Sequence, residues 1–398
     1  MGIGYRSDYL PDCNGFLNNL IMKKEKEIIK SLLSGTGITI NGSSPHDPQI
    51  HNEDFYNRVL REGSLGLGES YMDGWWDCEK LDQFFDKILT AELDSRVKNN
   101  WRIMFKLAWN FVLNSGRRSK AFEIGEKHYD IGNDLFRAML DKRLTYTCGY
   151  WNPSTGSGHE TTLDEAQEAK LDLVCQKIGL KRGQKILDIG SGWGSFIGYA
   201  AERYGVNALG ITVSKEQKEL ADKLYKNFSV ETKLQDYRDI NEKFDHIVSL
   251  GMFEHVGYKN YRTFMTVAHN ALKDNGLFLL HTIGGSCSVG SDDPWLAKYI
   301  FPAGMLPSIK QISKSIERLF VVEDWHNFGA DYDKTLMAWY NNFENNWEKI
   351  KKDYDERFYK MWKYYLLSCA GAFRARKNQL WQIVFSKKGV SGGYKAVR

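Results

Sequence analysis

The stretch SLGMFEHVG at residues 249–257 places two groups capable of chemistry, Glu254 and His255, directly after an apolar run. Charged groups beside apolar ones are costly to bury unless they are paired. Glu254 therefore caps a helix or pairs with a lysine where the chain surfaces, or it holds a ligand in a dry pocket. We interpret His255 as structural. The residues that the fold brings near Glu254 decide between these alternatives.

A second candidate is the glycine-rich segment KILDIGSGWGSF at 185–196, an apolar run followed by Gly190, Gly192 and Gly194. Glycines at a strand-to-helix turn let the backbone approach a ligand closely. The spacing differs from the G-x-G-x-x-G of pyrophosphate sites, and no acidic residue follows about 20 residues later to bind a ribose. The segment therefore favours a phosphate-free nucleoside cofactor such as S-adenosylmethionine over NAD.

Polar side chains follow the next two predicted strands. Thr212, Ser214 and Gln217 come after the second strand, where neutral groups could hold the ribose and the amino-acid portion of such a cofactor. Asp236 and Tyr237 end the third strand, and Asp236 could accept a hydrogen bond from an adenine amino group. Any one of them could be purely structural, but three strand ends together favour a site.

The elements that must position these groups are alternating apolar strands and helices. Strands are predicted at KILDIG, VNALGIT, VETKLQDY, FDHIVSL, GLFLLHTIG, LFVVEDWHNFG and LWQIVFSKK, and a helix at 164–178. This alternation predicts an α/β fold with a parallel, doubly wound, Rossmann-like sheet. The N-terminal part looks mostly helical, with helices at about 23–33, from Asn52 or Asp54 to Gly63, and at 81–89.

Composition excludes several classes of protein. Lys and Arg total 54 against 50 Asp and Glu, and no basic block occurs, so nucleic acid is not an expected partner. The six cysteines form no C-x-x-C or zinc pattern, so no metal is expected. Neither a secretory signal nor a membrane-length apolar run is apparent, which predicts a soluble protein of a reducing compartment, the cytoplasm.

The segment 96–128 mixes aromatic and basic residues in the manner of an amphipathic helix. Such a helix suits a membrane surface. A linker helix packed on its own protein is the more common case, and we give it the greater weight.

The chain resembles the cyclopropane-fatty-acyl-phospholipid synthases, which use S-adenosylmethionine. The matching stretches run from residue 63 to the C-terminus and the segment from about residue 31 also agrees, while residues 1–25 match nothing. Ser191 stands where the family usually carries Cys, and the segment 152–163 is longer than expected. The matching stretches are GSLGLGESYMDGWW (63–76), EKHYDIGNDLF (126–136), TYTCGYW (145–151), ILDIGSGWG (186–194), SLGMFEHVGYKNY (249–261), LLHTIG (279–284), KYIFPAGMLPS (298–308), EDWHNFGADYDKTLMAWY (323–340) and CAGAFRARKNQLWQIVFS (369–386).

The resemblance implies a class I methyltransferase domain at 139–398, a linker at 113–138 and a helical, lipid-associated domain at 1–112. It implies methylene transfer from S-adenosylmethionine to a cis double bond in a phospholipid acyl chain, with bound bicarbonate as the proton acceptor. The implied partner is the bilayer, contacted peripherally at its inner face through the N-terminal domain and the basic segment 96–120, and a homodimer is considered.

Site residues follow from matching the motifs position by position. The implied bicarbonate holders are Cys148, Glu254, His281, the Ile283 backbone and Tyr332, and Cys369 is implied to line the pocket. Taken singly, Cys148 could be a buried small hydrophobe and His281 a core histidine. The cofactor site is predicted to comprise Tyr146, Thr147, Asp188, Gly190, Ser191, Gly192, Trp193, Gly194, Thr212, Ser214, Gln217, Asp236 and Tyr237.

Two competing functions are weighed against this one. Another C- or N-methyltransferase on the same scaffold would stop at the methyl stage and would need no proton acceptor. A lipid-binding or scaffolding protein would carry a vestigial cofactor site, against which the intact glycine loop argues.

Overall fold

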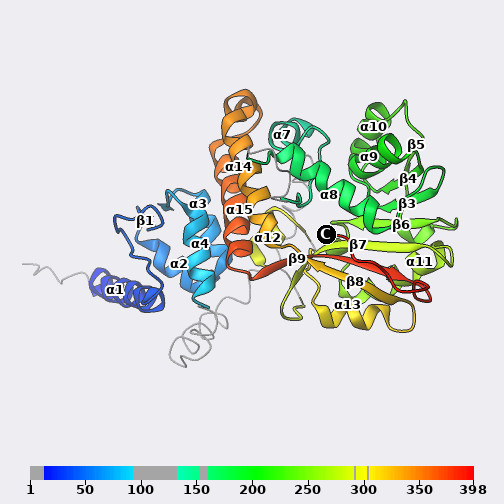
Figure 1. Cartoon of the computed structure of the whole chain (residues 1–398). Coiled ribbons are helices and arrows are strands. Elements are labelled where there is room, and N and C mark those ends of the chain that lie inside the picture. Colours follow the sequence, from blue (N-terminus) through cyan, green and yellow to red (C-terminus); the bar gives the residue numbers. More distant parts are fainter. Residues whose placement is uncertain (1–12, 93–131, 152–159, 291–292, 303) are drawn as a thin grey trace, which may run out of the picture. The chain divides into compact units, whose positions relative to one another are not determined.

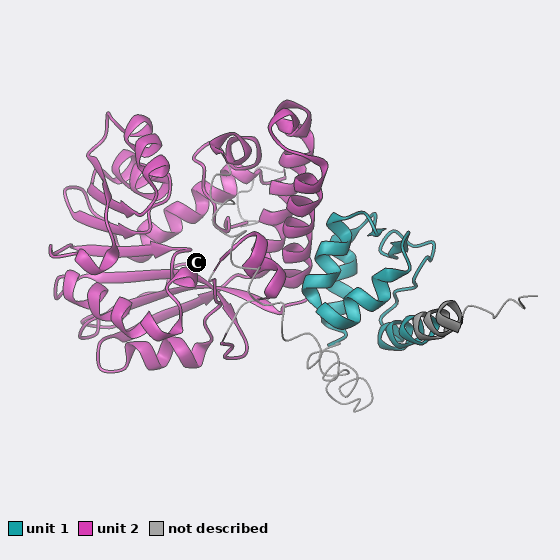
Figure 2. Ribbon diagram, turned by 180° about the vertical axis from the view of Figure 1, so that it is seen from behind, with its two compact units in different colours: residues 1–122 teal, residues 123–398 magenta. Residues whose placement is uncertain are grey.

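The computed structural model describes residues 13–92, 132–151, 160–290, 293–302 and 304–398. The chain divides into two compact units, Met1–Phe122 and Glu123–Arg398 (Figure 2). The basic segment 96–128 and most of the expected linker at 113–138 lie outside the described residues. The last residues of that linker form helix α7, Asn133–Met139, which packs within the second unit. There, Asn342 and Asn346 donate side-chain hydrogen bonds to the backbone at the end of α7.

The first unit is mostly helical, as the sequence predicts. Its aromatic core centres on Trp76, which is fully buried and contacts Phe55, Tyr71 and Phe84. Gly63 ends α2 as expected, with a φ of 61°. The elements are α1 (Cys13–Leu33), α2 (Asp54–Glu62), α3 (Ser64–Met72), α4 (Leu81–Thr90) and the antiparallel pair β1 (Gln49–Ile50) and β2 (Trp76–Asp77).

The second unit is built on a seven-stranded sheet of order β5-β4-β3-β6-β7-β9-β8 (Figure 1). All seven strands lie where the apolar runs predict them. The strands β5, β4, β3, β6 and β7, which follow one another in the sheet, pair in parallel. Strand β9 is antiparallel to both of its neighbours, β7 and β8, so the sheet is mixed. The strands are β3 (Lys185–Ile189), β4 (Asn207–Thr212), β5 (Val230–Leu234), β6 (His246–Leu250), β7 (Leu277–Gly285), β8 (Val321–Asn327) and β9 (Asn378–Ser386).

Successive side chains of a strand point to opposite faces of the sheet and pack into two separate hydrophobic cores. Leu187 and Ile247 pack toward α11 and α13, whereas Ile186 and Val248 pack toward α8 and α9. The helices therefore cover both faces of the sheet (Figure 1). Besides α7, the helices of this unit are α8 (Leu163–Lys177), α9 (Ser195–Tyr204), α10 (Lys215–Leu224), α11 (Tyr261–Ala271), α12 (Pro294–Tyr299), α13 (Ile309–Ile316), α14 (Ala330–Ile350) and α15 (Glu356–Arg374).

The order of strands creates a switch point between β3 and β6. From β3 the chain moves outward to β4 and β5, then returns to the other side of β3 with β6 and β7. Ligands of open α/β sheets bind at the carboxyl ends of strands at such a point. The glycine loop follows β3 and the Glu254 segment follows β6, so the topology brings both to this edge. In the part of the chain that the structure describes, no helix has the length and apolar character needed to span a bilayer.

Candidate functional site

Glu254 lies in the short 3₁₀ helix η5, Phe253–His255, just beyond the end of β6. Its carboxylate is buried and accepts a 2.6 Å hydrogen bond at Oε1 from the backbone N–H of Ile283 on β7. Its Oε2 atom is buried with no partner among the described residues. Burial raises the pKa of the carboxyl group to about 7. Glu254 therefore neither caps a helix nor pairs with a lysine, and one oxygen remains available to a ligand.

The Ile283 amide already has an acceptor within the protein. The resemblance implies that this N–H donates to a bound anion, but in the structure it donates to Glu254. A buried carboxylate takes the nearest donor because an unpaired charge is costly in a dry environment. Ile283 is thus a residue that orients Glu254.

His281 lies two residues before Ile283 on β7, opposite Leu250 of β6. Its side chain is almost fully buried, and burial together with the charges of Lys170 and Lys177 holds its pKa well below the usual value. Gln382 donates to Nδ1 at 3.3 Å, which places the proton of the neutral ring on Nε2. That Nε2 is buried and has no partner in the described chain. His281 thus offers a neutral hydrogen-bond donor close to Glu254.

Cys148 and Tyr332 come from two segments joined by Thr335. Thr335 Oγ1 accepts hydrogen bonds from Gly149 N (3.0 Å) and Trp151 Nε1 (2.9 Å), and lies 3.7 Å from Cys148 Sγ. Tyr332 lies one turn earlier on the same helix, α14. Burial raises the pKa of the Cys148 thiol well above its usual value, so Cys148 is a neutral thiol here and is not set up as a nucleophile.

The segments that carry Cys148 and Tyr332 lie near those that carry Glu254 and His281. Burial raises the pKa of Tyr332 far above its usual value, and the neighbouring ionisable groups of Cys148, Glu254, Tyr146 and Cys369 act in the same direction. Cys148, Glu254 and Tyr332 are all buried, and each of the first two influences the pKa of the third, so they lie in one region of the interior. His281 joins them because Gly251, three residues before Glu254, donates its N–H to His281 O at 2.9 Å. The four residues predicted to hold an ion thus lie in one buried region of the second unit, and their roles as ion holders stay predictions.

Cys369 lies on α15 between Tyr365 and Phe373, at a spacing of four residues that puts all three on one helix face. Phe373 stacks on Tyr332, with 4.5 Å between ring centroids, and Tyr365 OH lies 2.8 Å from Tyr146 OH. Cys369 thus belongs to an aromatic wall beside the site, as expected of a residue that lines a pocket.

Thr335→Val should lower the free energy of unfolding by about 2–4 kcal/mol, because the N–H groups of Gly149 and Trp151 would lose their buried acceptor. Urea unfolding would measure the change. Thr335→Ser keeps the hydroxyl group and serves as the control, with an expected loss of about 1 kcal/mol for one buried methyl. Equal losses in the two variants would contradict the role given to the hydroxyl.

The glycine loop has the backbone that a close-fitting ligand requires. Gly190, Gly192 and Gly194 all have positive φ, at 88°, 54° and 83°. A Cβ on Gly190 would overlap Met252, whereas a Cβ on Gly192 would meet no described atom within 4 Å. Asp188, at the end of β3, is buried with Oδ1 unpaired among the described residues, and burial raises its pKa to about 7. The open space at Gly192 would admit a nucleoside. The buried carboxylate of Asp188 could accept a hydrogen bond from a cationic amino-acid portion of that nucleoside.

Side chains after β4 and β5 are already engaged with one another. Thr212 Oγ1 donates to Gln217 Oε1 at 2.9 Å, and Ser214 caps α10 by accepting from Gln217 N. Asp236 forms hydrogen bonds with the guanidinium group of Arg238, which lowers the pKa of its carboxyl group. These contacts fix the two loops at the carboxyl edge of the sheet. They leave the cofactor roles of these residues as predictions.

Other predicted cofactor residues serve partly as packing groups. Trp193 donates to Asn133 Oδ1 at 3.0 Å and packs on Phe136 of α7. Ser191 Oγ lies 3.4 Å from Ile211 O, beneath the loop. Tyr237 contacts Phe264 of α11. These contacts are structural, and the cofactor roles of the three residues stay predictions.

Sequence reasoning missed the residues that support the TYTCGYW segment. Gln167 and Lys170 on α8 donate to Thr147, to its backbone oxygen and to its hydroxyl group respectively, both at 2.7 Å. Because Cys148 follows Thr147 directly, these bonds fix its position. A lysine and a glutamine on a helix with a capping box gave no signal of function in the sequence.

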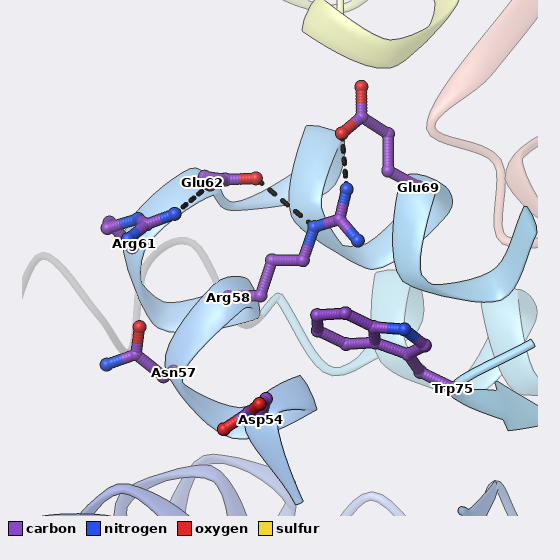
Figure 3. Close-up of a pocket in the computed structure, with 7 residues that line it drawn as sticks. All are labelled: Asp54, Asn57, Arg58, Arg61, Glu62, Glu69 and Trp75. Carbon is purple, nitrogen blue, oxygen red and sulfur yellow. Dashed lines mark hydrogen bonds and ion pairs between the residues drawn. The ribbon is translucent and has the colours of Figure 1, made fainter. Parts of the chain in front are cut away.

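The first unit contains a separate hollow of about 350 Å³ (Figure 3). Its charges are largely satisfied internally, since Arg58 forms ion pairs with Glu62, Glu69 and Asp73 and lies 4.8 Å above the ring of Trp75. None of the predicted site residues lines this hollow. Among the residues that the structure describes, no group of three His, Cys, Asp or Glu side chains is placed to hold a metal ion.

The chain matches one family model and is similar in sequence to several known proteins. The family model described as mycolic acid cyclopropane synthetase matches residues 116–383. The cyclopropane-fatty-acyl-phospholipid synthase of Escherichia coli strain K12 is 51% identical over 371 residues, which cover 93% of this chain and 95% of the relative. Cyclopropane mycolic acid synthase 2 of Mycobacterium leprae is 33% identical over 295 residues, 67% of this chain and 94% of the relative.

Solved structures of cyclopropane synthases are also similar to this chain. The cyclopropane synthase MmaA2 from Mycobacterium tuberculosis is 31% identical, with a TM-score of 0.61 over 67% of this chain and 98% of that one. The mycolic acid cyclopropane synthase CmaA1, solved with SAH and CTAB, is 33% identical, with a TM-score of 0.60 over 67% and 98%. With the glycine loop at the switch point of its sheet, the chain belongs to the cyclopropane-fatty-acyl-phospholipid synthase family and is an S-adenosylmethionine-dependent methyltransferase.

Proposed function

We propose that the chain transfers a methylene group from S-adenosylmethionine to the cis double bond of an unsaturated acyl chain in a membrane phospholipid, with bicarbonate as the proton acceptor. The methyl-donor chemistry comes from the sulfonium group, a strong electrophile, whereas an isolated alkene is a weak nucleophile. As the alkene takes the methyl group, positive charge develops on carbon, and one methyl proton must leave as the ring closes. The site must therefore exclude water and provide a base.

The observation that carries the proposal is the pair of buried, unpartnered atoms Glu254 Oε2 and His281 Nε2. One is a hydrogen-bond acceptor and the other a donor, and bicarbonate offers a hydroxyl group to the first and anionic oxygens to the second. An ion held in this way keeps a basic oxygen free for the proton. A protein carboxylate facing the alkene directly would itself be open to alkylation, which explains why Glu254 would hold the base rather than act as one.

The surroundings suit a reaction that passes through positive charge on carbon. Tyr332, Trp339 and Phe373 are buried, and the half-buried Tyr146 contacts Trp339, so the four rings form one aromatic cluster beside the site. Aromatic faces stabilise a cation without donating a lone pair to it, each by about 1–2 kcal/mol when desolvated. A dry wall also keeps water from trapping the cation as an alcohol.

We further propose a peripheral contact with the bilayer at the cytoplasmic face, because the double bond of a phospholipid lies deep in the leaflet. The first unit and the basic segment 96–120 are the proposed contact, and a homodimer would double its area. This segment lies outside the described residues, so the proposal rests on its sequence alone.

The test is incubation of the protein with methyl-labelled S-adenosylmethionine and vesicles of cis-unsaturated phospholipid, followed by mass analysis of the acyl chains. We expect label in a cyclopropane ring, no label in saturated vesicles, and a rate that depends on added bicarbonate in buffer freed of carbon dioxide. A methyl-branched product would indicate a methyltransferase that does not close the ring. A full rate without bicarbonate would remove bicarbonate from the proposal.

A further inference from the structure

Lys170 is a charged residue inside the catalytic unit that the proposed reaction has not yet used. It lies on α8 and is fully buried, with its Nζ donating at 2.7 Å to the hydroxyl group of Thr147. Burial lowers the pKa of the ammonium group to about 8. A buried ammonium group with so few polar contacts is costly, and replacing such groups by apolar ones is often neutral or stabilising. Its presence calls for a reason beyond packing.

The charges around Lys170 belong to the two halves of the site. The carboxylates of Asp141 and Asp188 act to raise the pKa of Lys170, and the charge of Lys170 acts to lower the pKa values of Asp141, Asp188, Cys148 and His281. No carboxylate of the described chain lies within ion-pair distance of its Nζ, and Asp188 Oδ1 has no hydrogen-bond partner there. Lys170 is therefore a buried cation that reaches the site through Thr147, which packs against Gly251, and Gly251 donates its N–H to His281 O. Asp141 and Asp188 offset part of its charge without forming an ion pair with it.

The proposed anion site would be stabilised by such a cation. Glu254 in its ionised form and a bicarbonate ion would place two negative charges in one dry pocket. The other expected holders contribute no positive charge, because His281 is neutral and Cys148 and Tyr332 keep their protons. Like charges a few ångströms apart in a medium of low dielectric constant repel strongly. The sulfonium group of the cofactor would offset part of this repulsion, and a buried protein cation within electrostatic reach would offset more of it.

We propose that Lys170 is the positioning residue that supplies this charge, holding Thr147 and Cys148 in place while its buried ammonium group favours binding of the anion. This inference rests on the proposed function. Tethering of the segment alone does not account for the charge, because Gln167 already holds the backbone oxygen of Thr147 with a neutral amide. The charge is the property that a neutral donor could not replace.

The test is Lys170→Met, which keeps the length of the side chain and removes its charge. Lys387→Met is the matched control, since Lys387 has a side chain only 7% exposed but its charge acts on none of the site residues. Two quantities are measured in buffer freed of carbon dioxide: the bicarbonate concentration for half-maximal activity, and binding of ¹³C-bicarbonate detected by NMR with S-adenosylhomocysteine present. Cofactor affinity and the melting temperature are measured alongside.

We expect Lys170→Met to raise both bicarbonate constants about tenfold or more, with cofactor affinity within about threefold and Lys387→Met like the parent protein. Unchanged bicarbonate constants in a folded Lys170→Met protein would overturn the role of Lys170 while leaving the proposed function intact. No response of the parent protein to bicarbonate, and no NMR signal of binding, would remove both. If Lys170→Met does not fold, Lys170→Gln is subjected to the same measurements and the same criteria.

Discussion

Replacing Glu254 by Gln should reduce methylene transfer by about 10²–10⁴-fold, the range expected when the group that controls a proton transfer is lost. The amide oxygen can still accept from Ile283 N, so the local fold is retained. The other end of the side chain changes from an unpartnered acceptor to an NH₂ donor. It would then face the hydroxyl group of bicarbonate donor to donor, and the ion would no longer be held with its basic oxygen toward the substrate.

The measurement is the initial rate with labelled S-adenosylmethionine and unsaturated vesicles at saturating bicarbonate, together with the dissociation constant of the cofactor by calorimetry. Glu242→Gln is the control, because Glu242 is a half-exposed glutamate of the same unit that pairs with Lys185 and Lys233 at the surface. Cofactor affinity should stay within about twofold in both variants, since Glu254 does not belong to the glycine loop. Full activity of Glu254→Gln would contradict the proposed holder.

The raised pKa of Glu254 gives this prediction a pH signature. Burial raises the pKa to about 7, so the carboxyl group is protonated below this value and ionised above it. Only the ionised form presents Oε2 as a pure acceptor. At a fixed bicarbonate concentration, the rate of the parent protein should therefore rise between pH 6 and pH 8. The residual rate of Glu254→Gln should lack that rise.

The sheet was predictable from the sequence because its signals are local. Apolar runs such as FDHIVSL are bounded by polar residues, and the glycine loop sits directly between β3 and α9. The direction of β9 was not predictable, since the long helices α14 and α15 separate it from β8 and nothing in its own pattern distinguishes a parallel from an antiparallel strand. Direction depends on where the preceding helix ends, which is a property of tertiary packing.

The site was predictable only in part, for a related reason. Cys148, Glu254, His281 and Tyr332 were identified by matching motifs, since segments so far apart in the sequence give no evidence of contact by themselves. Thr335, which reaches Gly149 across 186 positions, gave no signal at all. The hydrogen bond from the Ile283 amide to Glu254 was not predictable, because a motif records which residues are present but not which hydrogen bonds they form.

Replacing Gly192 by Val should abolish detectable binding of S-adenosylmethionine. Gly192 has a φ of 54°, and a Cβ at this position would enter space that no described atom occupies within 4 Å. In the bound protein, that space is where the cofactor would approach the backbone most closely. Two effects of the substitution must be separated, the strain of a β-branched residue at positive φ and the loss of room for the ligand.

Gly183→Val separates them. Gly183 precedes β3 in the same unit and has a φ of 80°, and a Cβ there would likewise meet no described atom within 4 Å, but it lies at the opposite end of the strand from the loop. Both variants should lose about 1–2 kcal/mol of folding free energy through backbone strain. Only Gly192→Val should lose cofactor binding in calorimetry. If both variants lost binding equally, strain would be the cause. If neither did, the cofactor would not lie against Gly192, and the geometry of the proposed transfer, which places the sulfonium group between this loop and the Glu254 pocket, would have to be abandoned.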